Sequence, residues 1–138
     1  MKSILFVCHG NICRSVMAEF IFKYLSNNKY KVESRATSND EIGNDIYPNS
    51  KEVLRKNNIP FTKHSAKRIT MDDYNKFDLI VGFDSYNIKN IEKITNDLSK
   101  VIKLNEKDVD DPWYTRDFDT AYKEIYEGCV RLLERLDS

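Results

Sequence analysis

The chain has 138 residues, in which 22 Lys and Arg balance 22 Asp and Glu. This length predicts one domain, residues 1–138, with a substantial core, and the balanced charge argues against nucleic-acid binding and polybasic membrane contact. Three cysteines without a framework spacing favour a reducing, cytoplasmic setting, and the short apolar stretch after Lys2 predicts neither a signal peptide nor a transmembrane helix.

The first elements enclose the most informative segment. Residues 4–7, Ile-Leu-Phe-Val, predict a buried parallel strand, and residues 17–22 carry apolar side chains at helical intervals. Between them, five residues separate Cys8 from Arg14. The residues of this loop that we expect to surround a phosphate are His9, Gly10, Asn11, Ile12, Cys13 and Arg14.

A loop between a strand and the start of a helix suits an anion, because backbone N–H groups and the positive end of the helix dipole point at it. Cys8 would lie at the bottom of this loop, where such donors and Arg14 hold its thiol as the nucleophilic thiolate. The planar Arg14 guanidinium can bind two phosphoryl oxygens, and Gly10 and Asn11 tolerate a left-handed backbone. The alternative is a buried structural cysteine at a chance distance from an arginine.

Strands and helices then alternate. Residues 31–35 predict a second strand, followed by a polar, turn-rich stretch and a helix over residues 49–57 that stops before a proline. Residues 78–83 predict a third strand, with Asp84 at its carboxyl end. The remaining predicted elements are a helix over residues 85–94, a strand over 100–104 and a helix from about 118 to 136.

This alternation predicts an α/β fold, a four-stranded parallel twisted sheet with helices on both faces. In such sheets, ligands bind outside the carboxyl ends of the strands. The loop of residues 8–15, Asp84, and the segment of residues 110–114 all follow strands and would meet at that edge.

The segment after the fourth strand offers an acid. A thiolate that attacks a phosphate ester needs the leaving oxygen protonated, and the phosphocysteine intermediate then needs a water deprotonated. Asp111 precedes Pro112, which fixes the loop, and lies beside Trp113 and Tyr114, which could flank an aromatic leaving group. Asp110 is a competing acid, and an exposed Asp-Pro turn is the alternative for the whole segment.

Five segments in the same order resemble the low-molecular-weight protein tyrosine phosphatases. They are residues 7–15, 34–38, 64–70, 84–87 and 111–114. The resemblance implies that family's single-domain, flavodoxin-like (Rossmann-like) fold and hydrolysis of phosphotyrosine or other aryl phosphate monoesters, with no cofactor and no metal. It also implies a phosphotyrosine-containing protein or peptide as the substrate, phosphate and related oxyanions as inhibitors, and no nucleic-acid or membrane partner.

The resemblance gives the central residues their roles. Cys8 would be the nucleophile, Arg14 would bind the phosphate, and Asp111 would act as general acid and then as general base. Ser15 would stabilise the thiolate as a leaving group when water attacks.

A second set of residues would support the site. The resemblance implies that Asn11, Ser34 and His64 hold the strained backbone of the loop by hydrogen bonds, and that Asp84 orients Arg14. Polar residues at strand ends, and a surface or core histidine, are the alternatives without the resemblance.

The chain departs from the family at several positions. Val16 replaces a frequent proline at the start of the helix. Asp40 and Glu41 lie where many relatives have an aromatic or large apolar wall of the substrate cleft, which leaves the substrate preference open. Trp113 replaces the usual tyrosine. The expected cleft walls are Asp40, Glu41, Trp113 and Tyr114.

Other functions share this loop. Arsenate reductases of the same fold need further cysteines, which are absent between Cys13 and Cys129. Protein arginine phosphatases of this fold carry threonine in place of Ile12. A non-catalytic phosphotyrosine-binding module is the alternative without catalysis, and a zinc site is disfavoured because Cys8, His9 and Cys13 lack a paired ligand spacing.

The remaining cysteines have separate predictions. Cys129 lies on the apolar face of the last helix and is expected in the core. Cys13 is either a packing residue or a redox partner, and we hypothesise that oxidised Cys8 forms a disulfide with it that protects the nucleophile.

Overall fold

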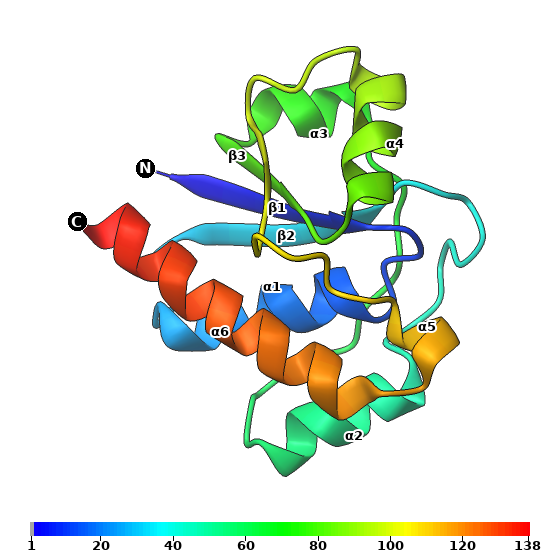
Figure 1. Ribbon diagram of the computed structural model, residues 1–138, viewed down its shortest axis with the longest axis vertical. Coiled ribbons are helices and arrows are strands. Elements are labelled where there is room, and N and C mark those ends of the chain that lie inside the picture. The colour runs from blue at the N-terminus through cyan, green and yellow to red at the C-terminus, as the bar shows by residue number, and fades with distance from the viewer. Residues whose placement is uncertain (1) are drawn as a thin grey trace.

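A parallel sheet forms the centre of the molecule. The computed structural model describes residues 2–138, and its four strands lie in the order β2-β1-β3-β4 (Figure 1). All three strand pairs are parallel, so the predicted fold class is confirmed. The strands are β1 (Ser3–Cys8), β2 (Lys31–Ala36), β3 (Leu79–Gly82) and β4 (Val101–Lys103).

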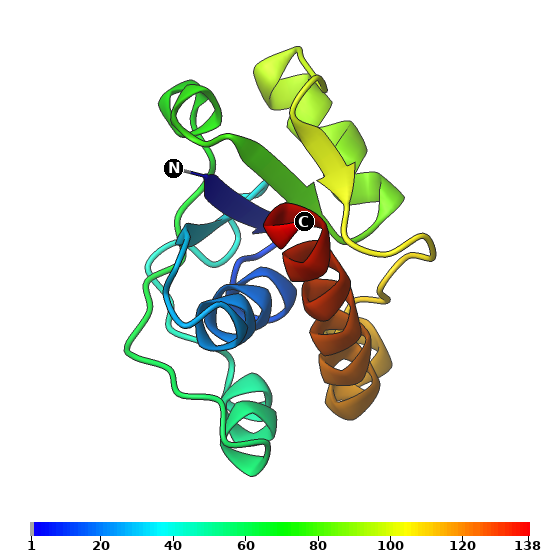
Figure 2. The same cartoon turned by 90° about the vertical axis from the view of Figure 1, so that its left-hand side faces the viewer.

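Helices cover both faces of this sheet (Figure 2). The helices α1, α2 and α6 pack on one face, and α3 and α4 lie on the other. Their bounds are α1 (Arg14–Leu25), α2 (Pro48–Lys56), α3 (Met71–Lys76), α4 (Ser85–Thr95), α5 (Pro112–Thr115) and α6 (Phe118–Asp137).

The central strand β1 joins the two halves of the core. Ile4 and Phe6 pack with residues of α1 and α6, whereas Leu5 and Val7 pack with residues of α3 and α4. All four side chains are fully buried. A strand that is buried on both faces has no polar alternation, which is why residues 4–7 form a continuous apolar run.

Two short helices, α3 and α5, are absent from the predicted elements. The helix α3 begins with a capping box in which Thr70 Oγ1 accepts from Asp73 N–H, and Asp73 Oδ2 accepts from Thr70 N–H, each at 3.1 Å. Only Tyr74 of α3 is buried, and α5 is a single turn that opens with Pro112. Neither helix is long enough to produce a helical apolar period.

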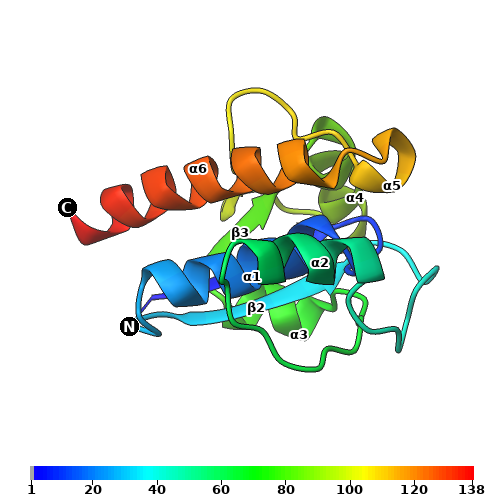
Figure 3. The same ribbon diagram turned by 90° about the horizontal axis from the view of Figure 1, so that it is seen from below.

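One end of the molecule gathers the segments that follow the strands. Thr37 and Ser38, just beyond β2, donate their N–H groups to the carbonyl oxygens of Cys8 and His9 at 2.9 and 3.1 Å. The loop after β1, the loop after β2 and α5 lie together at this end, away from both termini (Figure 3). The expected ligand-binding edge is therefore built from three separate parts of the chain.

Two negative findings apply to residues 2–138. No helix there combines the length and the apolar composition that crossing a membrane requires. Nowhere in the same residues do three or more His, Cys, Asp or Glu side chains gather in a way that could hold a metal ion.

Gly128 lets α6 pack closely against the segment that leaves β4. A Cβ atom at this position would lie 2.6 Å from Leu104 Cγ and 2.3 Å from Asn105 Oδ1. Alanine ordinarily stabilises a helix interior relative to glycine by up to about 1 kcal/mol, but this overlap reverses the sign. We expect Gly128→Ala to lower the free energy of unfolding by about 1–3 kcal/mol in denaturant titrations. Glu127→Ala, on the exposed face, is the control, and a more stable Gly128→Ala protein would contradict this packing.

Candidate active site

Hydrogen-bond donors surround the Cys8 thiol at the end of β1. Its Sγ lies 3.0 Å from Ser15 Oγ and accepts from the backbone N–H groups of Asn11 and Ser15, each at 3.4 Å. The helix α1 begins at Arg14, so the positive end of its dipole lies beside the same loop. Donors and a positive dipole end stabilise a negatively charged sulfur, which suits a nucleophile.

Asn11 holds the loop in its unusual backbone conformation. Its φ is 61°, in the left-handed region that asparagine tolerates. The buried Asn11 side chain donates to Ser15 Oγ at 2.8 Å and accepts from Lys67 N–H at 3.2 Å. His64 Nε2 lies 2.7 Å from the Asn11 carbonyl oxygen. The structure therefore brings Asn11 and His64 together at the loop, where the resemblance places them.

Ser34 lies elsewhere, so the expectation that it holds the loop directly is wrong. Its Oγ donates to Glu19 Oε1 on α1 at 2.6 Å, and Lys23 Nζ donates to Glu19 Oε2 at 2.6 Å. In the sheet, Ser34 pairs with Phe6, short of Cys8, at which the loop begins. Its hydrogen bond consequently anchors β2 to α1.

Arg14 is the most deeply buried charge of the site, with 2% of its side chain exposed. Its Nη1 donates to Asp84 Oδ2 at 2.6 Å and to the Val109 carbonyl oxygen at 2.9 Å, and its Nη2 lies 3.4 Å from Asp111 Oδ2. Burial acts to lower the pKa of Arg14, but the negative charges of Cys8, Asp111 and Asp84 outweigh it and raise this pKa. The guanidinium therefore stays charged.

Arg14 has a fixed orientation and a free hydrogen-bond donor, both of which favour anion binding. Asp84 caps α4, where its Oδ1 accepts from Asn87 N–H at 2.7 Å, so the carboxylate that orients Arg14 is itself fixed. Arg14 Nε is buried and has no hydrogen-bond partner in residues 2–138. An unpaired buried donor costs about 1–3 kcal/mol, which an oxyanion bound at this nitrogen would recover.

A cavity of about 330 Å³ opens beside Cys8. It brings together most of the residues that the sequence singles out, including all four expected cleft walls. Its lining is Cys8, His9, Gly10, Ile12, Cys13, Asp40, Glu41, Asp111, Trp113 and Tyr114.

The structure distinguishes the two competing acids. Asp111 lines the same cavity as Cys8, and its Oδ1 accepts from Trp113 N–H at 3.0 Å as the cap of α5. Asp110 lines an adjoining cavity and makes no hydrogen bond or ion pair within residues 2–138. The geometry therefore favours Asp111 as the acid.

The rim of the cavity is part aromatic and part charged. Trp113 and Tyr114 are exposed, whereas His9 Nε2 lies 2.8 Å from Asp40 Oδ2 beside Glu41. His9 and Asp40 are both expected site residues, but their pairing could not be predicted from the sequence because they lie on different loops.

Tyr47 and the Val109 carbonyl also make contacts at the site, and these could not be predicted from the sequence. The Tyr47 N–H donates to the Ile12 carbonyl oxygen at 2.9 Å, and the Val109 carbonyl accepts from Arg14. Both contacts use backbone atoms, for which residue type gives no signal.

Phosphatases that pass a phosphoryl group through cysteine need a stabilised thiolate, a fixed cation and an acid in one place. The fold places a cysteine with donors around its sulfur, a buried arginine and a carboxylate together at the sheet edge where α/β proteins bind ligands, an arrangement typical of the cysteine-dependent phosphatases. Comparison with known proteins is more specific. The model of the family "Low molecular weight phosphotyrosine protein phosphatase" matches residues 3–138, and the chain belongs to this family.

Members of this family are similar to the chain over nearly its whole length. A low molecular weight protein tyrosine phosphatase from Streptococcus pyogenes is 43% identical, with a TM-score of 0.96, over 100% of this chain and 95% of that one. The low molecular weight protein-tyrosine-phosphatase YfkJ of Bacillus subtilis is 37% identical over 96% of this chain and 94% of its own length. The predicted enzyme class, protein tyrosine phosphatase, is confirmed.

Two more distant structures are described with a ligand or a substrate class. Vibrio vulnificus Wzb in complex with benzylphosphonate is 25% identical, with a TM-score of 0.91, over 97% of this chain and 98% of that one. A Drosophila arginine phosphatase is 28% identical, with a TM-score of 0.90, over 100% of this chain and 99% of that one.

The other two cysteines are poor nucleophiles. Burial raises the pKa of Cys13 to about 12. Burial also raises the pKa of Cys129, which is fully buried in the core as predicted. All three cysteines are free thiols, and the hypothesis of a disulfide between Cys8 and Cys13 stays a prediction.

The donors around the Cys8 sulfur and the burial of Cys13 predict selective alkylation. Near neutral pH, iodoacetamide should modify Cys8, while Cys13 stays protonated and reacts only as the pH rises towards about 12. Mass spectrometry of tryptic peptides over a pH series would measure both rates. Inorganic phosphate should slow the reaction of Cys8, and equal labelling of Cys13 near neutral pH would contradict the prediction.

Proposed function

We propose that Cys8, Arg14 and Asp111 carry out the phosphatase reaction on phosphotyrosine in a protein or peptide. The observation that supports this most directly is the shared cavity of about 330 Å³, which Cys8 and Asp111 both line. Arg14 lies beside Asp111, with its Nη2 3.4 Å from the carboxylate. Its unpaired Nε offers the phosphate a positively charged hydrogen-bond donor.

In the first step, the Cys8 thiolate attacks phosphorus, and a P–S bond forms as the P–O bond to the tyrosine oxygen breaks. The electron pair of the broken bond moves to that oxygen, which takes the proton from Asp111. Arg14 and the N–H groups of the loop hold the equatorial oxygens, where negative charge is concentrated in the transition state.

In the second step, water attacks the phosphocysteine, and the Asp111 carboxylate accepts its proton. The P–S bond breaks, its electron pair returns to Cys8, and phosphate leaves. Asn11 donates to Ser15 Oγ at 2.8 Å, which leaves the Ser15 hydroxyl proton free to face the sulfur 3.0 Å away. Ser15 thus stabilises the departing thiolate.

The depth and the aromatic rim of the cavity favour phosphotyrosine over phosphoserine. Cys8 is 3% exposed, so only a long side chain brings its phosphate to the thiol. Trp113 and Tyr114 offer ring faces to an aryl group. The benzylphosphonate complex of the Vibrio vulnificus relative supports an oxyanion that carries an aromatic ring as a ligand of this cavity.

Two alternatives within the fold have less support. The similarity to a Drosophila arginine phosphatase makes phosphoarginine an alternative substrate. The apolar Ile12 disfavours it, because Ile12 lines the cavity at the position where arginine phosphatases of this fold carry threonine. An arsenate reductase would need a further accessible cysteine, and Cys129 is fully buried.

Substitution of the nucleophile and of the acid tests the mechanism. Cys8→Ser should abolish turnover and keep phosphate binding. Asp111→Asn should lower kcat/KM for phenyl phosphate, a poor leaving group, by about 100-fold, and much less for 4-nitrophenyl phosphate. Asp110→Asn is the matched control, and a loss there equal to that in Asp111→Asn would move the acid role.

A substrate panel tests the specificity. Phosphotyrosine peptides should be hydrolysed in preference to phosphoserine and phosphoarginine peptides, and arsenate should not be reduced. Because Asp40 and Glu41 line the cavity, peptides with basic residues beside the phosphotyrosine should be favoured over acidic ones by about threefold or more at low salt. Faster turnover of phosphoarginine would overturn the proposed substrate class.

A further inference from the structure

Arg116 joins three aromatic rings beside the acid segment. Its guanidinium carbon lies 5.3 Å from the ring centre of Tyr47, 5.9 Å from that of Trp113 and 5.4 Å from that of Phe118. Its Nη2 donates to Tyr47 Oη at 2.9 Å, and its Nη1 donates to the Trp113 carbonyl oxygen at 3.3 Å. We call these four residues the Arg116 brace.

One end of the brace is attached to the phosphate-binding loop. The Tyr47 N–H donates to the Ile12 carbonyl oxygen at 2.9 Å. The Tyr47 ring packs against a buried cluster that contains Ile12, Cys13 and Phe118. Tyr47 is therefore held by the loop both through its backbone and through its ring.

The other end is attached to the segment that carries the acid. Asp111 caps α5, and the Arg116 N–H donates to the Pro112 carbonyl oxygen at 2.9 Å, which closes the single turn of this helix. Tyr47 and Trp113 also contact each other edge to face, with ring centres 5.0 Å apart. The brace thus links the loop of Cys8 to the helix of Asp111.

The acid segment needs such an anchor. A single helical turn is not stable by itself, and of the four residues in α5 only Pro112 is buried. Arg14 contacts Asp111 at 3.4 Å, beyond ordinary hydrogen-bond length. The contacts that fix α5 to the phosphate-binding loop are therefore mainly those of the brace.

We propose that Arg116 is a positioning residue, which holds α5 against Tyr47 so that Asp111 faces the oxygen of the leaving group. This proposal rests on the proposed role of Asp111 as the acid. Proton transfer in the transition state depends steeply on distance and direction. A displaced α5 therefore impairs protonation of the leaving group and leaves the phosphate-binding loop intact.

The test compares Arg116→Asn with the unchanged chain. Arg116 has a φ of 61°, and asparagine adopts this conformation readily, so the substitution removes the guanidinium without straining the backbone. We expect kcat/KM for phenyl phosphate to fall by about tenfold and that for 4-nitrophenyl phosphate by less than about twofold. The inhibition constant of inorganic phosphate should not change.

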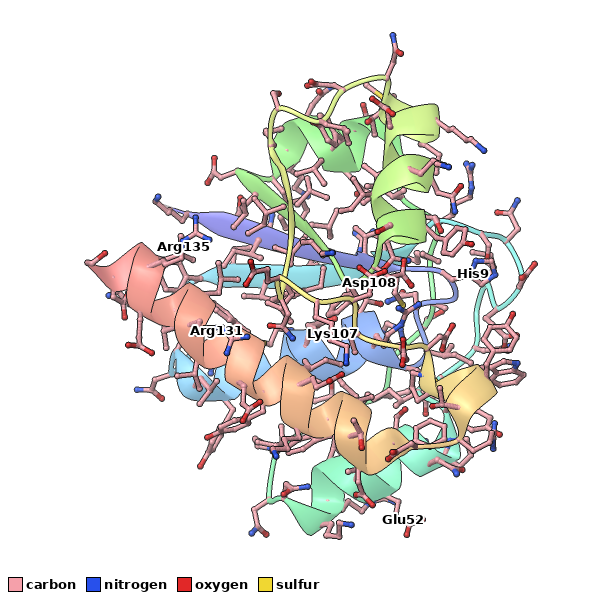
Figure 4. The ribbon with its side chains drawn as sticks, viewed as in Figure 1. His9, Glu52, Lys107, Asp108, Arg131 and Arg135 are labelled. Carbon is pink, nitrogen blue, oxygen red and sulfur yellow. The ribbon has the colours of Figure 1, made fainter. Side chains whose placement is uncertain are left out.

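The control is Arg135→Asn, which removes an exposed arginine of α6. Figure 4 shows Arg135 near the C-terminal end of that helix, far from His9 at the mouth of the site. It should leave both kcat/KM values unchanged.

Asp111→Asn, assayed in parallel, separates the two proposals. If Asp111→Asn loses activity equally for both leaving groups, the acid assignment fails. If it shows the leaving-group dependence and Arg116→Asn does not, the brace proposal alone is overturned.

A purely structural role for Arg116 would reduce activity on both substrates alike and weaken phosphate binding, and that outcome also overturns the proposal. Tyr47→Phe gives a second measurement should Arg116→Asn fold poorly. It keeps the ring and removes only the hydroxyl that accepts from Arg116, so we expect a smaller loss with the same leaving-group dependence. No such dependence in a folded Tyr47→Phe protein would contradict the brace.

Discussion

The ion pair between Arg14 and Asp84 is the constraint on which the site depends. A buried guanidinium needs a negatively charged partner and hydrogen-bond acceptors, because removing it from water costs several kcal/mol. Asp84 supplies one partner from the end of β3 and the Val109 carbonyl supplies another from the segment beyond β4. Arg14 itself begins α1, so this one side chain ties together the ends of three neighbouring parts of the sheet. Cys8, the proposed nucleophile, lies six residues before Arg14 and is placed by the same contacts.

Much of this arrangement could be predicted from the sequence, since it depends on local patterns. The apolar run of β1, the spacing from Cys8 to Arg14 and the acid before Pro112 each have a direct physical meaning, and the parallel direction of the strands follows from their alternation with helices. Ser34 shows where this reasoning ends. Its residue type suits a hydrogen bond to the loop, but its register beside Phe6 directs it to Glu19 instead, and register is fixed only by the assembled sheet.

The contacts that could not be predicted join loops that are distant in sequence. His9 contacts Asp40, and Arg116 contacts Tyr47. In both pairs the residues are far apart in the sequence, and no helical or strand periodicity relates them. The charged pair at the rim also changes how the cavity meets a substrate. Where an aromatic wall would favour any aryl group through its ring face, a carboxylate beside an imidazole selects by charge, and Glu41 adds to this effect. We therefore expect the departure at Asp40 to affect recognition of the peptide around the phosphate more than the chemistry.

The loop of residues 8–15 and the segment that carries Asp111 are consequently fixed to different extents. The proposed phosphate-binding loop is anchored by hydrogen bonds to the segment after β2, to His64 and to the start of α1. Asp111, the proposed acid, caps one mostly exposed helical turn, which Arg116 joins to Tyr47 and Tyr47 joins to Ile12. Tyr47 binds the loop by its backbone and the acid segment by its ring. The distance between Cys8 and Asp111 is therefore fixed by direct contacts between the two segments and not only by the sheet. A change in this distance would alter protonation of the leaving group without altering phosphate binding, so the two effects can be separated by substrates with different leaving groups.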